Sequence, residues 1–566
     1  MKMPTLSNLS TVIFAILPLI LSSSIALACG GLFCDNNLPV NQAAERILFA
    51  PDPVEDLMHM HVLITYQGPP ENFGWLLPVP PGTQFGLSRP ALFSELDTRY
   101  APTFRLNRIS AEYCPQERGD SSLSFAQADN EAGVQEEEEV QVTSQSQVGP
   151  YDQVTLRAET VDALVEWLEE NQYQVPPNAT ETLAPYLTEY EFLAIKLASG
   201  QESGDIQPIL LNFSGHLATI PLRPTAVASE PDMGVIVHLL GPARAIPSNY
   251  QLVELNLAAL DWFNPSQHYS QLVSHAVDES DDGHGFVTDF AGQHEFPVEE
   301  IAPTVSASLV LAMEEVRNSE SLYEVLGYLL ADIVQTDLTQ VLLSALPLSR
   351  EENQTLIELA TSGQAISSVE VGLLIHDENG ESFDVDGAAI AQALTIYNHG
   401  GLSIQRAFQV NPYLTRLYTT LNASEMSVDT SFDFNPDLDN VDNNRVADLY
   451  LDCNGRSDYI VTPDGLEVDL SLDREIIERQ NGQSVRGVDT IGAAMIVRSM
   501  SAGQSEVIID QRETLANTYK LKRPTADGFF GCQQPTHKTN APFDSASHVI
   551  FGLLIISLMM RRHRHI

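Results

Sequence analysis

The chain is poor in basic residues and in cysteine. Its 566 residues include 29 Lys and Arg against 76 Asp and Glu, which gives a formal charge of −47 at pH 7. Nucleic-acid binding depends on cations that displace counterions from phosphates, so this balance excludes a nucleic-acid-binding protein. Five cysteines are too few and too scattered for a disulfide scaffold or for a zinc site built from cysteine alone.

Motifs that specify common reactions are also missing. The sequence has no Gly-x-Ser-x-Gly, phosphate-binding loop or glycine-rich dinucleotide motif. His294 and Glu295 begin like a zinc-protease helix, but the second histidine is missing and Pro297 would break that helix. The residues therefore specify no reaction, and we expect a non-catalytic protein rather than an enzyme.

At its N-terminus the sequence contains the pattern of an export signal. Residues 1–28 begin with Lys2, continue through an apolar run at 12–21 and end in the small-residue exit of residues 26–28. This order is typical of a secretory signal peptide, and cleavage after Ala28 would make Cys29 the first residue. A buried helix is the alternative, which Pro18 disfavours. Lipid attachment to Cys29 is a second alternative.

A second apolar run lies near the C-terminus. Residues 549–560 are apolar, and Arg561, Arg562 and Arg564 follow them. At ~1.5 Å per residue this run spans about 18 Å, less than the ~30 Å hydrocarbon core, so it is marginal as a permanent span. The terminal arginines place the tail in the cytoplasm and the body outside, which predicts a membrane anchor or sorting tail at 549–566.

The cysteines suit an oxidising compartment. Cys29 and Cys34 are spaced for a small loop-closing disulfide, and Cys453 with Cys532 could staple the C-terminal region, which leaves Cys114 odd. If Cys29 is lipidated instead, the remaining cysteines are even in number. The spacing alone fixes neither pairing.

Hydrophobic periodicity predicts an α+β fold that is β-rich, with antiparallel sheets or a sandwich in the N-terminal half, a helical middle and a mixed C-terminal region. Residues 58–66 alternate apolar and polar side chains, and the prolines of 74–81 confine that segment to a sheet edge. Further strands are predicted at 46–50, 153–158, 191–198, 208–213, 218–224, 233–241, 494–498 and 506–509, and helices at 161–168, within 302–360 and at 387–397.

The predicted domain organisation follows these patterns. We expect a signal peptide at 1–28, a β-rich domain at 29–300, a helical or mixed region at 301–420, an α/β region at 421–532, a spacer at 533–548 and the tail at 549–566. Residues 116–149 carry a glutamate run and Ser/Gln repeats, which predicts a disordered acidic insertion.

Several segments together resemble an uncharacterised family of exported bacterial proteins, domain of unknown function 2330. They are Ala28-Cys29-Gly30-Gly31-Leu32-Phe33-Cys34, Gly74-Trp75-Leu76-Leu77-Pro78-Val79-Pro80, Val148-Gly149-Pro150-Tyr151, Pro221-Leu222-Arg223-Pro224-Thr225-Ala226-Val227 and Asn411-Pro412-Tyr413-Leu414-Thr415-Arg416-Leu417-Tyr418-Thr419. The resemblance covers about residues 28–440. It implies an envelope-associated protein and supplies no reaction, cofactor or catalytic residue.

The best candidate for a ligand site is an acidic loop at 278–289. Asp278, Ser280 and Asp282 occupy the first, third and fifth positions of a calcium loop, and Asp289 occupies the twelfth. Gly283 would supply the sharp turn. Against this, Asp289 is shorter than the usual Glu, and Pro297 weakens a following helix. The hypothesis is a calcium site, and the alternative is a solvated acidic turn.

Other candidates are weaker. His59 and His61 share one face of a predicted strand and could hold a metal, but no third ligand can be named and surface histidines explain them equally well. The aspartates between 433 and 448 are expected in an exposed turn because Asp442 stands where a calcium loop needs glycine. Trp75 lies between apolar residues, which favours a core position over a binding edge.

The function we expect is therefore that of an exported cell-envelope protein, outside the cytoplasmic membrane and anchored by its C-terminal tail. It would act as a non-catalytic interaction or structural module with protein or envelope partners. The alternative is an extracytoplasmic enzyme, such as a hydrolase, whose site is assembled from residues distant in sequence. A pocket with convergent His, Asp, Ser or Cys side chains would favour the enzyme.

Overall fold

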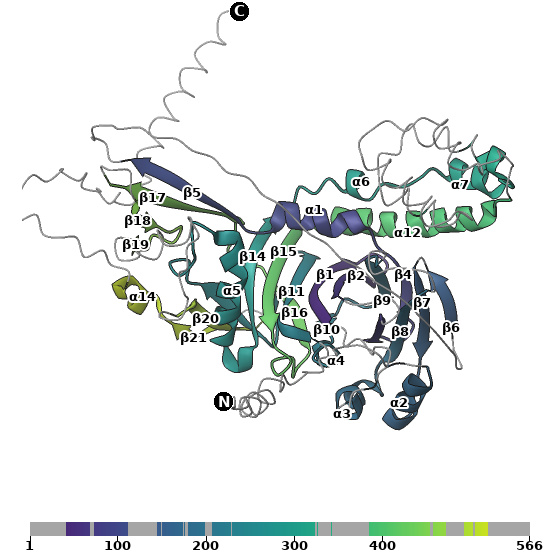
Figure 1. The fold of residues 1–566 in the computed structure, drawn as a ribbon, viewed down its shortest axis with the longest axis horizontal. Helices are drawn as coiled ribbons and strands as arrows, with labels where there is room; N and C mark the ends of the chain where they lie inside the picture. Colours follow the sequence, from purple (N-terminus) through teal and green to yellow (C-terminus); the bar gives the residue numbers. More distant parts are fainter. Residues whose placement is uncertain are drawn as a thin grey trace, which may run out of the picture.

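The fold was analysed in a computed structural model of the full chain. The residues described are 41–67, 73–110, 144–148, 150–171, 173, 175, 179–198, 206–227, 229–322, 325, 341, 384–452, 457–470, 492–501 and 504–518. These residues form an α+β fold organised around one large sheet, and the N-terminal half is mostly β (Figure 1).

The large sheet has ten strands of mixed direction. Their order is β21 (Gln504–Asp510), β20 (Ala494–Ser501), β13 (Gln251–Leu255), β14 (Gly285–Gln293), β15 (Tyr413–Leu421), β11 (Ser229–Gly241), β1 (Asn41–Asp52), β2 (Leu57–Gln67), β9 (Ile209–Ser214) and β4 (Gln84–Leu87). β1 pairs with β11 in parallel and with β2 in antiparallel orientation. Since β15 and β20 pair with strands of the N-terminal half, the sheet runs across the boundaries predicted at residues 300 and 420.

Three smaller sheets pack around the large one. They are β10 (Ala218–Ile220), β16 (Thr430–Asn435) and β12 (Arg244–Pro247); β19 (Glu467–Asp469), β18 (Ser457–Val461), β17 (Asn444–Leu451) and β5 (Thr103–Ser110); and β3 (Gly74–Val79), β8 (Glu191–Leu197), β7 (Tyr151–Leu156) and β6 (Ser144–Val148). β17 pairs with β5, so the C-terminal region completes a second sheet begun in the N-terminal half.

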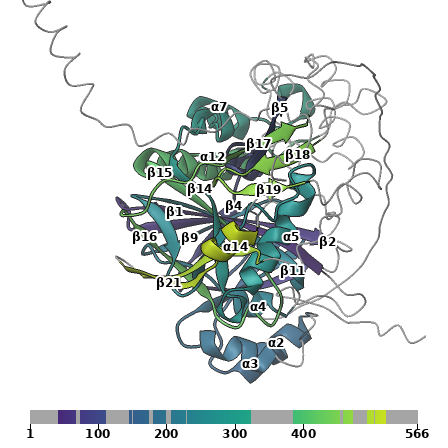
Figure 2. The ribbon, with the colours of Figure 1, turned by 90° about the vertical axis from the view of Figure 1, so that its left-hand side faces the viewer.

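The described helices are short, except for one. They are α1 (Pro90–Tyr100), α2 (Val161–Glu170), α3 (Ala179–Leu183), α4 (Leu222–Thr225), α5 (Pro265–Asp278), α6 (Val298–Ile301), α7 (Ala307–Glu314), α12 (Gly387–Val410) and α14 (Arg512–Thr518), with 3₁₀ turns at Ala184–Tyr186 and Asp281–Gly283. Thr160 caps α2 because its hydroxyl accepts a hydrogen bond from the backbone N–H of Ala163. α7 and α12 lie at the end opposite α2 and α3 in both views (Figures 1 and 2).

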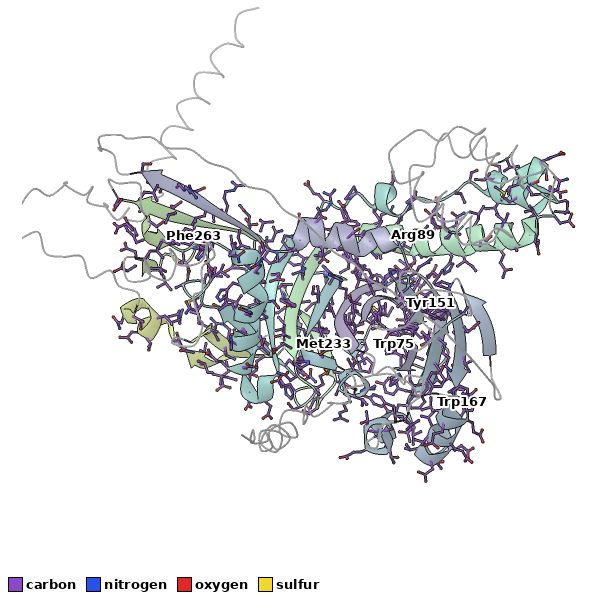
Figure 3. All side chains as sticks on the ribbon, viewed as in Figure 1. Trp75, Arg89, Tyr151, Trp167, Met233 and Phe263 are labelled. Carbon is purple, nitrogen blue, oxygen red and sulfur yellow. The ribbon has the colours of Figure 1, made fainter. Side chains whose placement is uncertain are left out.

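The two faces of the large sheet have different neighbours. The inner face is apolar and packs against the β10 and β3 sheets through residues such as Ile47, Met60 and Val237. Trp75 and Tyr151 lie in this layer (Figure 3), and Trp75 is buried as predicted. The opposite face carries Leu48 and packs against α1 and α12, with α5 over β15, so we call it the helix-covered face.

Most predicted strands and helices are confirmed, with shifted boundaries. Of residues 74–81, the segment Gly74–Val79 forms the edge strand β3, as the prolines predicted. Residues 218–224 differ because the strand ends at Ile220 and α4 follows. The predicted acidic insertion at 116–149 also needs correction at its end, because β6 pairs with β7. The predicted helix at 387–397 continues to Val410.

The predicted export and anchoring segments lie outside the described residues. So do Cys29, Cys34, Cys114, Cys453 and Cys532, and with them both predicted disulfides. Among the described helices, none combines the length and the hydrophobicity that a membrane crossing requires. The tail at 549–566 was not part of that set.

Candidate functional site

The helix-covered face holds most of the buried charged residues in the described part of the chain. Arg46, on β1, and Arg416, on β15, point to this face beside apolar neighbours such as Leu48 and Leu414. Two polar groups form there. We call them the aspartate–arginine network, around Asp289, and the histidine cluster, around His59.

The aspartate–arginine network joins five elements, which are β1, β14, β15, α1 and α5. Arg416 Nη1 donates to Asp289 Oδ2, and Arg416 Nη2 donates to Asp97 of α1 at 3.2 Å. Asp97 also accepts from Arg46 Nε at 2.9 Å, and the Tyr269 hydroxyl of α5 donates to Asp289 Oδ1. The network therefore ties α1 and α5 to the sheet through hydrogen-bonded charges.

Burial dominates the electrostatics of this network. The Asp289 side chain is fully buried and that of Arg416 is 5% exposed. Burial raises the pKa of Asp289, while the Arg416 guanidinium and the Tyr269 hydroxyl oppose the rise. Burial and the neighbouring Asp289 carboxylate raise the pKa of Tyr269 well above its usual range. These groups stabilise one another and are closed to solvent at Asp289.

The histidine cluster lies where the β1–β2 hairpin meets α12. His59 and Asn212 are directly opposed on β2 and β9, and His59 Nδ1 bonds to Asn212 Oδ1 at 2.6 Å. Because the amide oxygen can only accept, Nδ1 carries the proton and Nε2 is the free nitrogen of neutral His59. Nε2 lies 4.0 Å from Asp52 Oδ2, which Arg406 Nε approaches to 2.8 Å.

Asp52 makes contacts with both the β1–β2 turn and α12. Its Oδ1 accepts from the backbone N–H groups of Val54 and Glu55, at 2.9 and 3.2 Å. Burial alone would raise the pKa of Asp52, but these two N–H groups and the Arg406 guanidinium outweigh it, so the pKa lies below its ordinary value. Arg406 also pairs with Glu55, and its side chain is 39% exposed. The cluster therefore opens to solvent at one side.

Two further histidines lie on the same face between the groups. His61 Nδ1 bonds to Ser88 Oγ at 2.7 Å, and burial lowers the pKa of His61 to about 3. Burial, with the nearby Arg416, also lowers the pKa of His238. The prediction that His59 and His61 share one face is confirmed, but both are buried, so the surface alternative is not what the structure shows.

The predicted calcium-loop residues face different environments. Asp278 is exposed at the end of α5, Asp282 is exposed in a 3₁₀ turn, and the buried Ser280 hydroxyl donates to the Val277 carbonyl. Asp289 belongs to β14 and bonds to Arg416. A strand follows the loop where a calcium motif continues into a helix, and the calcium site stays a prediction.

The acidic residues from 433 to 448 also stay apart. Asp437, Asp439 and Asp442 are exposed between β16 and β17, as expected of a turn, whereas Asp433 lies in β16 and Asp448 lies in β17, where it accepts from Asn107 Nδ2 at 3.0 Å. Across the described ranges, no three His, Cys, Asp or Glu side chains gather in a way that could hold a metal ion.

The sequence alone did not identify the arginines that pair with the buried aspartates of these two groups. Arg416 and Arg406 are distant in sequence from the aspartates they pair with, so no local motif links them. A usable signal was present, however, because Asp289 and Arg416 are the lone charges of their strands. A charge in such a position needs an opposite charge from another element.

Comparison with protein families gives the identity of the chain. The model of the family described as "Uncharacterized protein conserved in bacteria (DUF2330)" matches residues 23–432. The chain belongs to this family. The match confirms the resemblance seen in the sequence and covers both polar groups of the helix-covered face. It ends within β16, so β17 to β21 and α14 lie beyond the matched residues.

The other comparisons add no relative. No curated protein and no solved structure matches the chain.

Proposed function

We propose that this family member is an exported cell-envelope protein, anchored by its C-terminal tail and acting as a non-catalytic interaction or structural module. The signal-peptide pattern of residues 1–28 supports export, and the apolar run at 549–560 followed by arginines supports anchoring. The charge of −47 suits a soluble body that carries charged surfaces to partners.

One observation carries the non-catalytic part of the proposal. Two carboxylates of the helix-covered face, the fully buried Asp289 and the partly exposed Asp97, are used to bind the elements to one another: Asp289 by Arg416 and Tyr269, and Asp97 by Arg46 and Arg416. A catalytic acid or base must reach a substrate, and Asp289 has no exposed surface. The network is suited to rigidity rather than to turnover.

The histidine cluster favours the second candidate, an extracytoplasmic enzyme such as a hydrolase. His59 has one free ring nitrogen beside the Asp52 carboxylate, and the partly exposed Arg406 pairs with that carboxylate. A histidine and a carboxylate in this relation can move a proton. The 4.0 Å separation and the 6% exposure of His59 count against this candidate.

Localisation is tested by fractionation of two variants. Truncation before Ala546 should release a folded protein from membranes, and replacement of Arg561, Arg562 and Arg564 by Ser should weaken retention because the cytoplasmic stop is removed. N-terminal sequencing should find Cys29 first. The anchor is refuted if the truncated chain misfolds and the arginine variant fractionates as wild type.

The module and the enzyme are separated by complementation of a deletion strain of the source bacterium. For a module, His59→Gln should restore the wild-type phenotype as well as the unchanged chain does. For an enzyme that uses His59 as a base, the variant should fail although its fold and membrane retention are intact. Leu402→Gln, an equally polar change at an exposed site of α12, is the matched control.

A further inference from the structure

The two edges of the large sheet are treated differently. β4 forms one edge, and α12 lies against it so closely that a Cβ atom on Gly400 would stand 2.7 Å from the Leu87 carbonyl oxygen. β21 forms the other edge, and no strand of the described ranges pairs with its outer side. β20, β21 and α14 lie at the margin of the ribbon, at the end opposite α7 (Figure 1). An open edge offers backbone N–H and C=O groups to another strand.

The open strand is unusually apolar for an exposed edge. Val507 is 41% exposed and Ile508 is 49% exposed, and Ser505 and Glu506 beside them are also exposed. Val497 pairs with Ile509 and Arg498 with Val507, so Ile508 is the extra residue of a β-bulge. Consecutive exposed residues show that both faces of β21 reach solvent, as for a strand that lacks a neighbour.

The hairpin that presents this edge is firmly attached. β20 pairs with β13 over Gln251–Leu255. The Glu279 carboxylate accepts from Gln511 Nε2 at 2.7 Å, and Asn256 Nδ2 donates to the Gly492 carbonyl at 2.8 Å. Contacts from the residues that directly follow α5 and β13 therefore hold the open end of the hairpin, and a strand that added to β21 would meet a preformed edge.

The charges around the strand indicate the kind of partner. Arg498 is paired with Glu254 and Arg512 with Asp510. Glu506 and Glu513 are exposed and make no ion pair with another described residue. Among the described residues around β21, the excess is therefore acidic. A second copy of a chain with charge −47 would be repelled, whereas a basic segment would be attracted.

We propose that β21 is a docking edge that binds an extended basic segment of a partner protein by strand addition. Backbone hydrogen bonds would give the affinity, Val507 and Ile508 would contact apolar side chains of the added strand, and Glu506 would pair with its Lys or Arg. The proposal rests on the proposed interaction role and names its partner class. Because β21 lies beyond residue 432, this edge is formed outside the matched family region.

The test uses the full chain and a fluorescein-labelled synthetic peptide that alternates Val and Lys, with binding followed by fluorescence anisotropy. A second peptide has the same sequence with N-methyl groups on alternate amides, and a third has Glu in place of Lys. Strand addition requires the peptide amides, which the second peptide lacks at alternate positions, and the third peptide carries the wrong charge for an acidic edge. Each control peptide should therefore bind at least about tenfold more weakly.

Variants of the chain locate the binding surface. Val507→Glu and Ile508→Glu should each weaken binding of the Val/Lys peptide about tenfold or more. Glu506→Gln should weaken it a few-fold at low salt and less at high salt, because only the ion pair is lost. Val54→Glu is the matched control, since Val54 is 74% exposed on the distant β1–β2 turn, and it should leave binding unchanged.

Several results would overturn the proposal. Equal binding of the N-methylated peptide would reduce the effect to charge attraction, and equal loss in Val54→Glu would remove the assignment to β21. A concentration-dependent dimer that Ile508→Glu abolishes would make a second copy the occupant. Failed peptide binding with intact membrane retention refutes this edge alone, whereas lost retention with intact peptide binding refutes only the proposed location.

Discussion

The two faces of the large sheet treat buried carboxylates in opposite ways. On the helix-covered face, the buried Asp289 of β14 meets Arg416 of the neighbouring strand β15. On the inner face, Glu45 of β1 lies directly opposite Ile64 and Val235, and its Oε2 is buried with no hydrogen-bond partner among the described residues. Burial raises the pKa of both Asp289 and Glu45, but only at Asp289 do an opposite charge and hydrogen bonds oppose the rise.

The largest effect is expected where a paired charge loses its partner. Asp289→Asn leaves the buried Arg416 guanidinium with only the partly exposed Asp97 as a carboxylate partner, so we expect the free energy of unfolding to fall by about 3 kcal/mol. Urea titration measures the loss. The double variant Asp289→Asn/Arg416→Gln should lose less than the sum of the two single changes, because neither residue then leaves a buried charge. Additive losses would show that the pair does not act as one unit.

The next prediction concerns Glu45, the unpaired carboxylate, whose replacement should raise the free energy of unfolding rather than lower it. Burial raises the pKa of Glu45 from 4.5 to about 7. The folded state then binds more protons than the unfolded state between these values, so the free energy of unfolding falls as pH rises from about 4.5 to about 7, by about 3 kcal/mol in all. Glu45→Gln has no such titration and should be more stable than wild type above neutral pH.

The difference between Glu45→Gln and wild type isolates this residue, because other titrating groups are common to both. We expect the two unfolding free energies to agree near pH 4.5 and to separate by up to about 3 kcal/mol near pH 8, with the variant higher. Chemical denaturation at a series of pH values measures both curves. Parallel curves would mean that Glu45 stays charged and is solvated or paired.

A third change tests how closely α12 seals the helix-covered face. Gly400→Ala would place a Cβ atom 2.7 Å from the Leu87 carbonyl oxygen, and backbone cannot move as a side chain can. We expect a loss of about 1–3 kcal/mol. Gly86→Ala on β4 is the control, since its Cβ would meet nothing nearer than 3.9 Å, and it should change stability little. Equal effects of the two changes would show that α12 yields at this contact.

The sequence predicted the strands of the large sheet better than it predicted the pairing of the charged residues on that sheet. The alternation at 58–66 follows from a local period of two residues, which is why β2 and the shared face of His59 and His61 were predicted. The pairing of Asp289 with Arg416 spans 127 positions and depends on the register of β14 with β15. A single sequence contains no local signal for that register.

The acidic loop at 278–289 also shows that a local pattern does not predict the partners of a side chain. Its twelve-residue spacing matches a calcium loop, but spacing gives only positions along the chain. The apolar run around Phe286 and Val287 turns the last part of the loop into β14, which carries Asp289 into the core. Strand burial and a charge partner from β15 therefore decided the role of Asp289, and only Phe286, Val287 and their neighbours pointed towards it.

The smallest effect is expected at the histidine cluster, where the paired face opens to solvent. Asp52→Asn keeps an oxygen for the Val54 and Glu55 N–H groups but removes the charge that faces Arg406. Arg406 is 39% exposed, so water screens the pair, and we expect at most about a third of the loss seen for Asp289→Asn. Urea titration of both variants side by side measures the ratio.

Salt and pH distinguish the two aspartates further. The loss in Asp52→Asn should shrink between ~50 and ~500 mM NaCl, whereas that in Asp289→Asn should persist because its pair is buried. The pKa of Asp52 is lowered, so its contribution to stability is present above its ordinary value of 3.8 and is lost as pH falls below it. Wild type and Asp52→Asn should therefore converge in acid. If the loss of unfolding free energy in Asp52→Asn is large, independent of salt and unchanged in acid, Asp52 is as closed to solvent as Asp289.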